Sequence, residues 1–328
     1  MTYASFKSIG AYVPTEIRSN DWFVQRMDTT DEWITKRTGI SERRITSSEE
    51  NTSDLGYKAG LQAIERAGLE PKDIDLIVCA TISPDYLCMP STACLIADKL
   101  GIKDIMALDI SAACTGFIYA ISTAKAFIES GMKKNVLVIG AEKLSSIVDY
   151  TDRTTCMLFG DGAGASVIGA TDNKDEAIID INCSSDGALK DLLLTPSVQT
   201  QSEALSGGEK PFMQMKGNET FKIAVKTLTS DVKKLMEKND YVNEDIDFFV
   251  PHQANFRIIK AVGDALKFED SQKVLTVHKY GNTSSASIPM AINEIYENGS
   301  LKNGHTMLLD AFGGGLTWGS ALIKFAGK

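Results

Sequence analysis

Cys114 stands at the junction between two apolar runs with different patterns. Residues 105–110 read as a strand and residues 117–124 as a helix, and small residues crowd the thiol between them. Because a helix N-terminus carries partial positive charge, this position favours the thiolate, which is the nucleophilic form. Backbone N–H groups of the first helical turn lack intrahelical partners and could hold a developing oxyanion. These features indicate a nucleophilic cysteine, with a buried structural cysteine as the alternative.

His252 is the histidine best placed for chemistry. It directly follows a strand-like run at 248–250, and ligands of open α/β sheets bind beyond the carboxyl ends of such strands. His278 and His305 are interpreted as surface loop residues. No second histidine or cysteine stands at metal-ligand spacing from His252, so no metal site is expected. A hydrogen-bonded loop histidine remains the alternative for His252.

The sequence also contains an internal repeat. Residues 73–78 reappear as 245–250, and strand-like and helix-like patterns alternate around both copies. This predicts an α/β fold built from two similar βα halves, 1–172 and 173–328. Each copy is followed by a glycine-rich segment, and these two segments are fewer residues apart than the two repeated strands. This difference indicates an insertion in the first half around 144–157.

Asn282 follows Cys114 at nearly the spacing of this repeat. It stands among small residues before a helix-like run at 288–295, so we expect it near the position in the second half that Cys114 occupies in the first. An ordinary Gly-Asn turn is the alternative. The glycine-rich segment 311–319 precedes a strand and lacks Gly-Lys-Ser/Thr, which excludes dinucleotide and P-loop assignments. We expect its backbone to approach a substrate carbonyl closely.

Size and composition exclude several classes of protein. A chain of 328 residues is too long for one ordinary core, and its 43% apolar and 23% charged content is typical of globular proteins. The net charge of −9 argues against nucleic acid as the main partner. No apolar run approaches the ~20 residues of a membrane span, and no secretion signal is recognised. Six scattered cysteines without a C-x-x-C pair predict thiols in a reducing cytoplasm.

In their local contexts, Cys114, His252 and Asn282 resemble the thiolase-fold condensing enzymes, specifically β-ketoacyl-acyl carrier protein synthase III. The resemblance covers nearly the whole chain and implies two pseudo-symmetric halves in a five-layered α-β-α-β-α core. Elongating ketosynthases resemble a Cys-His-His pattern instead. The other motifs are, in order, Asp31-Glu32-Trp33-Ile34, Arg37-Thr38-Gly39-Ile40, Asp152-Arg153, Phe159-Gly160-Asp161-Gly162, His252-Gln253-Ala254-Asn255, Gly281-Asn282-Thr283-Ser284 and Gly313-Gly314-Gly315.

The resemblance implies a two-stage reaction that initiates type II fatty acid synthesis. Cys114 would take an acyl group from acetyl-CoA or another short acyl-CoA, with the N–H groups of Cys114 and Gly314 as the oxyanion hole. Malonyl-acyl carrier protein would then lose CO₂ and attack the acyl-enzyme. His252, through Nε2–H, and Asn282 would stabilise the enolate. No cofactor is implied, because the coenzyme A thioester is a substrate.

The resemblance also assigns binding residues. Trp33 and Arg153 would flank the adenine of coenzyme A. Arg37 and Thr29 match phosphate- and base-contacting positions, and Asn255 matches a pantetheine-contacting position. Arg257 matches a position that docks the acidic carrier protein. Met89 replaces a frequent phenylalanine that reaches across a homodimer to close the partner's acyl pocket. Since methionine is slimmer and more flexible, we expect primers somewhat longer than acetyl to be tolerated.

Two other functions remain open. One is an acyltransferase or condensing enzyme of secondary metabolism with the same fold and a different acyl primer. The other is a non-catalytic protein that binds acyl-CoA, but such a protein should have lost Cys114, His252 or Asn282, and all three are present.

Overall fold

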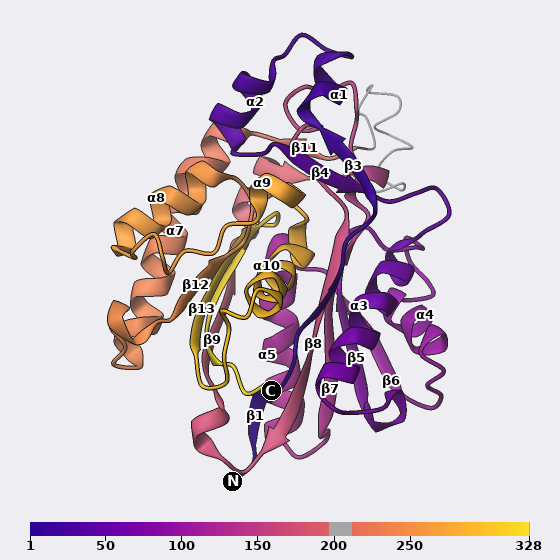
Figure 1. The fold of residues 1–328 in the computed structure, drawn as a ribbon, viewed down its shortest axis with the longest axis vertical. Coiled ribbons are helices and arrows are strands. Elements are labelled where there is room, and N and C mark those ends of the chain that lie inside the picture. Colours follow the sequence, from indigo (N-terminus) through magenta and orange to yellow (C-terminus); the bar gives the residue numbers. More distant parts are fainter. Residues whose placement is uncertain (197–211, 328) are drawn as a thin grey trace.

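The computed structural model describes residues 1–196 and 212–327. Figure 1 shows five layers in the order helices, sheet, helices, sheet, helices. This is the α-β-α-β-α arrangement that the resemblance predicts. Strands buried on both faces must be apolar throughout, and the fully buried run of Leu76–Ala80 meets that requirement.

The first sheet belongs to the N-terminal part of the chain. Its strand order is β1-β8-β7-β5-β6, and β2 also pairs with β8. Strands β5, β6 and β7 run parallel to one another, whereas β8 is antiparallel to β7. Its strands are β1 (Tyr3–Phe6), β2 (Gly10–Tyr12), β5 (Leu76–Ala80), β6 (Met106–Ile110), β7 (Asn135–Glu142) and β8 (Gly162–Thr171).

The second sheet has the strand order β12-β13-β14-β9. Here β12 is parallel to β13, and β14 is antiparallel to both β13 and β9. Its strands are β9 (Ile178–Ser185), β12 (Phe248–Pro251), β13 (Thr306–Gly313) and β14 (Thr317–Lys324).

Within the described residues, six helices fill the three helical layers. In Figure 1, α5 and α10 lie between the sheets, α3 and α4 cover the first sheet, and α7 and α8 cover the second. Each helical layer buries an apolar cluster against its sheet, so burial of apolar surface holds the layers together. These helices are α3 (Thr52–Arg66), α4 (Thr92–Lys99), α5 (Gly116–Glu129), α7 (Gly217–Lys238), α8 (Phe256–Leu266) and α10 (Ser287–Glu297).

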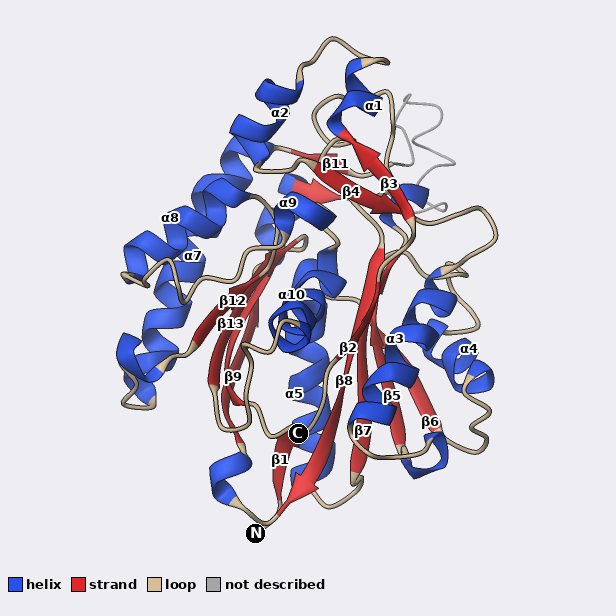
Figure 2. Cartoon of the chain, in the orientation of Figure 1, coloured by secondary structure: helices blue, strands red, loops and turns tan. Residues whose placement is uncertain are grey.

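The remaining elements gather at one end of the layers, which is the upper end in Figure 2. Some of them pack on a separate apolar cluster that includes Phe23, Ile34 and Leu144. These elements are α1 (Asn20–Val24), α2 (Asp31–Thr38), α9 (Val277–Tyr280), β3 (Glu16–Ser19), β4 (Glu42–Ile45), β10 (Leu193–Leu194) and β11 (Gln214–Met215).

The two sheets share one topology, since β1-β8-β7-β5 corresponds to β9-β14-β13-β12. The predicted boundary at 172 falls between β8 and β9. The expected insertion also has a place in the fold: residues 143–161 connect β7 to β8, whereas only 314–316 connect β13 to β14. Across the described ranges, we find no helix whose length and apolar character would allow it to span a bilayer.

Candidate active site

A cavity of about 900 Å³ opens at the end of the molecule where the smaller elements gather. Cys114, His252 and Asn282 all line it. They come from three places in the chain: the start of α5, the end of β12, and the turn before α10. The fold therefore brings the three predicted residues to one cavity, whereas His278 and His305 are not among its lining residues.

Cys114 lies in a short 3₁₀ helix, Ala113–Thr115, that leads into α5. Ala113 adopts a left-handed backbone with a φ of 46°, which forms the sharp turn before the thiol. A Cβ atom at Gly313 would lie 2.7 Å from the Cys114 nitrogen, so this glycine allows the two backbones to touch. The thiol is 6% exposed, and burial raises its pKa to about 12. Burial thus opposes the thiolate that a helix N-terminus favours.

His252 is held in place by its backbone and by its ring. Its backbone N–H donates to the carbonyl of Asp310 at 2.7 Å, and its Nδ1 lies 2.6 Å from Ser287 Oγ. Ser287 Oγ also accepts from Gln253 N–H at 3.3 Å, so its single proton is available for His252 Nδ1. That pairing leaves the ring proton on Nε2. Burial lowers the pKa of His252 to about 3, which keeps the ring neutral.

Asn282 is fixed by its backbone and by its side-chain oxygen. Its N–H donates to the Leu158 carbonyl at 2.8 Å, and its carbonyl accepts from Gly160 N–H at 3.0 Å. The side-chain Oδ1 accepts from Ser284 N–H at 2.8 Å, which leaves Nδ2 as a donor.

The structure shows which residue of the second half occupies the position equivalent to Cys114. The 3₁₀ helix Ser284–Ala286 before α10 matches the 3₁₀ helix Ala113–Thr115 before α5, and the first residue of each has a positive φ. Ser285 therefore occupies the position equivalent to Cys114, and Asn282 precedes it. Asn282 thus lies near the position equivalent to Cys114, as the repeat predicts, and three residues before it.

Gly314 directly follows β13, next to the glycine that touches the Cys114 nitrogen. A Cβ atom at Gly314 would lie 2.9 Å from the carbonyl oxygen of Leu193, so a side chain would not fit there without movement. The glycine-rich segment thus packs closely on Cys114 and Leu193, and its approach to a substrate carbonyl stays a prediction.

The outer part of the cavity carries the residues predicted to bind coenzyme A. Trp33, Arg37, Arg153 and Asn255 all line it. The guanidinium carbons of Arg37 and Arg153 lie 4.3 and 4.6 Å from the centre of the Trp33 ring system. Asn255 Nδ2 donates to the Arg37 carbonyl at 3.1 Å. Thr29 is not among the lining residues, although its hydroxyl is buried without a hydrogen-bond partner within the described chain.

Arg257 and Met89 are placed differently from each other. Arg257 is exposed and lines the cavity, with its guanidinium carbon 5.3 Å from the ring centre of Phe221. Met89 is 80% exposed and does not line the cavity of its own chain. Any effect of Met89 on an acyl pocket must therefore come through another copy of the chain or a movement of its loop.

Sequence reasoning missed several residues of the site. Phe221, Met215 and Asn218 line the cavity, and Asp310 lies fully buried at its wall with a pKa raised to about 8 by burial. Ser287 was visible only as one of many small residues after Asn282. No pattern in the sequence distinguishes these residues, because their importance depends on which strand ends meet.

No group of three or more His, Cys, Asp or Glu side chains within 1–196 and 212–327 is arranged to hold a metal ion. The inner part of the cavity presents a thiol, a neutral imidazole and an amide, from Cys114, His252 and Asn282. A nucleophile beside several uncharged donors suits acyl transfer and stabilisation of an enolate.

Comparisons with known proteins agree with this reading. Residues 108–187 match the family model of 3-oxoacyl-[acyl-carrier-protein] synthase III, and residues 236–325 match the model of its C-terminal part. A β-ketoacyl-[acyl-carrier-protein] synthase III from Sulfurimonas denitrificans is 66% identical, and the alignment covers 99% of each chain.

Solved structures of similar fold cover almost the whole chain as well. The 3-oxoacyl-[acyl-carrier-protein] synthase III of Aquifex aeolicus matches with a TM-score of 0.92 and 42% identity over 98% of this chain and 100% of its own. The priming β-ketosynthase of the R1128 polyketide pathway matches with a TM-score of 0.94 and 33% identity over 99% and 97%. These matches confirm the thiolase-like fold. The chain belongs to the β-ketoacyl-[acyl-carrier-protein] synthase III family, the condensing acyltransferases that initiate fatty acid synthesis.

Proposed function

We propose that Cys114, His252 and Asn282 form the catalytic set of this condensing enzyme, with acetyl-CoA or another short acyl-CoA as primer and malonyl-acyl carrier protein as extender. The observation that carries the proposal is that all three residues line one cavity. The two halves, 1–172 and 173–328, would each supply one side: the first carries the nucleophile, and the second carries the two donors.

In the first stage, the sulfur of Cys114 attacks the acyl-CoA thioester. The tetrahedral oxyanion forms beside the N–H groups of Cys114 and Gly314, and preorganised donors of this kind are typically worth ~3 kcal/mol each. Coenzyme A leaves as its thiolate and takes up the proton that Cys114 has lost. The product is an acyl-enzyme, as in a ping-pong scheme.

In the second stage, malonyl-acyl carrier protein binds and loses CO₂. The electron pair of the broken carbon–carbon bond passes into an enolate, whose oxygen needs hydrogen-bond donors and no base. His252 Nε2–H and Asn282 Nδ2–H supply two such donors. The enolate carbon then attacks the acyl group, and the released Cys114 thiolate recovers a proton.

The cavity mouth suits coenzyme A. The Trp33 ring, flanked by Arg37 and Arg153, offers a stacking surface for adenine if one guanidinium moves aside. The salt bridge between Arg153 and Asp28 spans 3.8 Å and both side chains are well exposed, so moving Arg153 costs little. Asn255 would contact the pantetheine arm, and Thr29 would contact the base.

Arg257 would dock the acidic carrier protein. It lies at the cavity mouth next to Lys222, which also lines the cavity and is exposed. We further propose that two copies form a homodimer in which Met89 of one copy closes the acyl pocket of the other. The six cysteines are free thiols, which supports a reducing, cytoplasmic location.

Mass spectrometry of the intact protein, incubated with acetyl-, butyryl- and hexanoyl-CoA, tests the first stage. We expect an acyl adduct on Cys114 and none on Cys114→Ser. CO₂ release from malonyl-acyl carrier protein tests the second stage. His252→Ala and Asn282→Ala should lower decarboxylation by about 10²-fold while keeping more of the acyl transfer.

His278→Ala is the matched control, because His278 does not line the cavity. Normal decarboxylation by both cavity variants would show that the donor roles are wrongly assigned.

Priming of a secondary-metabolite pathway is the second candidate, since the structural match to a polyketide priming ketosynthase is as close as that to a fatty acid enzyme. The same adducts distinguish the two. Preference for acetyl-CoA favours fatty acid synthesis, whereas an exclusive preference for a longer or branched primer favours the alternative.

A further inference from the structure

Glu142 is a fully buried carboxyl at the end of β7, outside the catalytic set. Its Oε2 lies 2.6 Å from Ser83 Oγ, 3.1 Å from Ile82 N and 3.2 Å from Thr81 Oγ1. Its Oε1 lies 2.8 Å from Ser285 Oγ and accepts from Ser285 N–H at 3.4 Å. One side chain therefore joins the start of the segment that leads to Met89 and the turn that is equivalent to the Cys114 turn.

The hydroxyl of Ser285 cannot make hydrogen bonds to both of its neighbouring oxygen atoms if Glu142 is ionised. Ser285 Oγ lies 2.8 Å from the Ala80 carbonyl oxygen and 2.8 Å from Glu142 Oε1. A hydroxyl has one proton, so it can donate to only one of these oxygens. A carbonyl carries no proton, and the second contact is therefore a hydrogen bond only if Glu142 donates it. The geometry requires a relay from Glu142 to Ser285 to Ala80.

The surroundings of Glu142 favour its neutral form as well. Burial raises the pKa of Glu142 by more than the hydrogen bonds from Ser83, Ile82 and Ser285 lower it. The titratable groups that face it are the thiols of Cys114, on the turn before α5, and Cys79, on β5, and burial raises the pKa of both. A neutral thiol offers no positive charge that would favour a carboxylate.

The relay lies against the start of α5, just after Cys114. Ser285 abuts the start of α5, since a Cβ atom at Gly116 would lie 3.3 Å from Ser285 Cβ. Gly116 is two residues after Cys114. The residue before Ser285, Ser284, donates its N–H to Asn282 Oδ1 at 2.8 Å. The position of Ser285 thus affects both the thiol and the amide.

We propose that Glu142 is a positioning residue that acts in its protonated form, donating a hydrogen bond to Ser285 and so fixing the Cys114 and Asn282 turns against each other. This inference rests on the proposed function for its catalytic consequence, but the protonation itself does not depend on that function.

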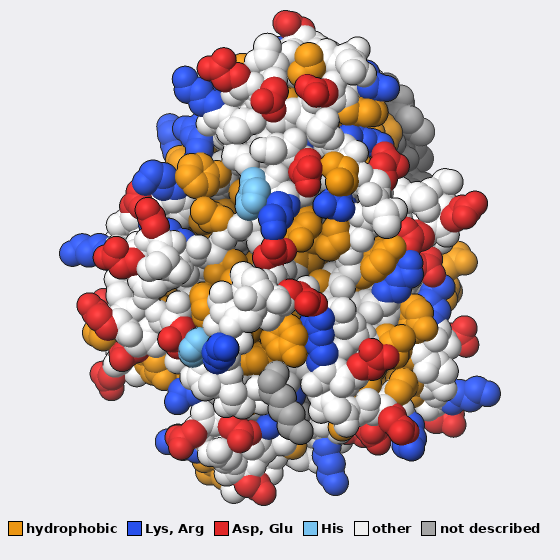
Figure 3. Space-filling model, viewed as in Figure 1, with side chains coloured by type: hydrophobic (Ala, Val, Ile, Leu, Met, Phe, Trp, Pro, Cys, Tyr) orange, Lys and Arg blue, Asp and Glu red, His pale blue; other side chains and the backbone are white. Residues whose placement is uncertain are grey.

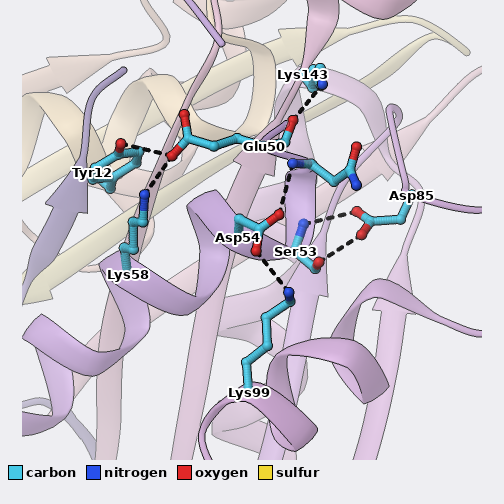
Figure 4. A network of polar contacts seen from close by, with 9 residues as sticks. Tyr12, Glu50, Ser53, Asp54, Lys58, Asp85, Lys99 and Lys143 are labelled. Atoms are coloured by element: carbon cyan, nitrogen blue, oxygen red, sulfur yellow. Dashed lines mark hydrogen bonds and ion pairs between the residues drawn. The ribbon is translucent and has the colours of Figure 1, made fainter. Parts of the chain in front are cut away.

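The segments around Glu142 have anchors of their own, shown in Figure 4. Lys143 Nζ contacts the carbonyl oxygens of Ser47 and Glu50. Asp85 accepts from Ser53 N–H at 2.8 Å and from Ser53 Oγ at 2.6 Å. Because these contacts do not involve Glu142, variants at Glu142 should keep the local fold.

Protonation is tested by comparing Glu142→Gln with the wild type in denaturant titrations from pH 5 to 8. The folded pKa is raised, so the wild type has its full stability below the unfolded value and loses stability as the pH rises toward the folded value. The unfolding constant of the wild type, relative to Glu142→Gln, should rise by about tenfold per pH unit in that window. The pH-dependent contributions of the other buried carboxyl groups to stability cancel in this comparison, because both proteins contain them.

Exposed Glu65 on α3 provides the control: Glu65→Gln should show no such pH-dependent difference. A difference between Glu142→Gln and the wild type that stays flat or reverses with pH would mean that Glu142 is ionised in the folded protein, and the inference would fail.

Positioning is tested by single-turnover acylation of Cys114. Glutamine supplies an amide donor to Ser285 and a carbonyl acceptor to Ser83, so Glu142→Gln should stay within about threefold of the wild-type rate, whereas Glu142→Ala, which loses buried hydrogen bonds, should be slower by about tenfold or more. Equal rates for the two variants would overturn the positioning role. If the wild type itself were not acylated at Cys114, the proposed function would fail instead, and the pH-dependent stability would still report on Glu142.

Discussion

The proton on Cys114 is the first obstacle to the reaction. A rise of the pKa from 9.0 to about 12 corresponds to ~4 kcal/mol against the thiolate. A helix N-terminus contributes only ~0.3–2 kcal/mol in its favour. Burial therefore outweighs the helix in the free enzyme, and the thiol rests in its neutral form. Acylation then requires the substrate and the oxyanion donors to stabilise negative charge as it forms, rather than a stored thiolate.

This balance predicts how Cys114 responds to pH. In the free enzyme, the rate of alkylation by iodoacetamide should rise about tenfold per pH unit from pH 6 to 10 without a plateau, because only the thiolate reacts. Peptide mass spectrometry measures this rate, with exposed Cys88 in the same digest as the reference. A plateau near neutral pH would mean that the helix N-terminus outweighs burial.

At the scale of elements, the segment between β5 and α4 connects the active site to the surface. Glu142 holds its first residues, and Asp85 ties its middle to the N-terminus of α3 (Figure 4). At its far end, the N–H groups of Thr92 and Ala93 donate to Asp109 at 2.7 and 2.8 Å. Three carboxyl groups thus fix the segment and leave its tip, 86–90, exposed.

Removing the middle anchor should loosen that tip. Asp85→Ala breaks two hydrogen bonds to Ser53 at a helix start, which should lower the free energy of unfolding by ~1 kcal/mol. If Met89 limits the acyl pocket, the ratio of hexanoyl- to acetyl-CoA turnover should rise as well. Urea titration and acylation assays measure the two effects. Asp98→Ala, an exposed change on α4, is the control; the same stability in Asp85→Ala and this control would remove the anchoring role.

Sequence patterns predict the central layers better than they predict the polar contacts. Apolar runs such as 76–80 identify buried strands because a strand covered on both faces must be apolar throughout. The internal repeat likewise predicts the matching order of strands. The relay from Glu142 to Ser285 has no such signal, since it joins residues far apart in the chain through one buried hydroxyl. The approach of Arg37 and Arg153 to Trp33 also depends on how loops fold over the cavity.

The whole molecule combines a negative net charge with a basic cavity mouth. The chain carries a net charge of −9. Four basic residues nevertheless line one opening: Arg37, Arg153, Lys222 and Arg257. In Figure 3, Lys and Arg side chains lie along the upper-left edge, over α2 and α8. Long-range repulsion and local attraction together would orient an acidic carrier protein toward the opening.

An exposed apolar surface indicates how two copies could associate. This surface is the tip 86–90, where Leu87 and Met89 are 76% and 80% exposed. Met106, at the opposite end of edge strand β6, is 41% exposed. Exposed edge strands and apolar side chains of this kind are typical of surfaces that pair with another chain. A dimer formed through this surface would bring Met89 of one copy toward the cavity of the other, from which its own fold separates it.

A charged residue within that surface should therefore disrupt both assembly and chain-length control. Leu87→Asp should shift the protein from dimer to monomer, because a desolvated carboxylate has no partner there. Light scattering after size-exclusion chromatography measures the mass. Met132→Asp, an equally accessible change after α5, should leave the dimer intact. Since Met89 would then no longer close the acyl pocket of a second copy, monomeric Leu87→Asp should also lose its preference among acetyl-, butyryl- and hexanoyl-CoA. A Leu87→Asp protein that stays dimeric would place the interface elsewhere. A wild type that is monomeric would leave Met89 without a route to the acyl pocket of a second copy.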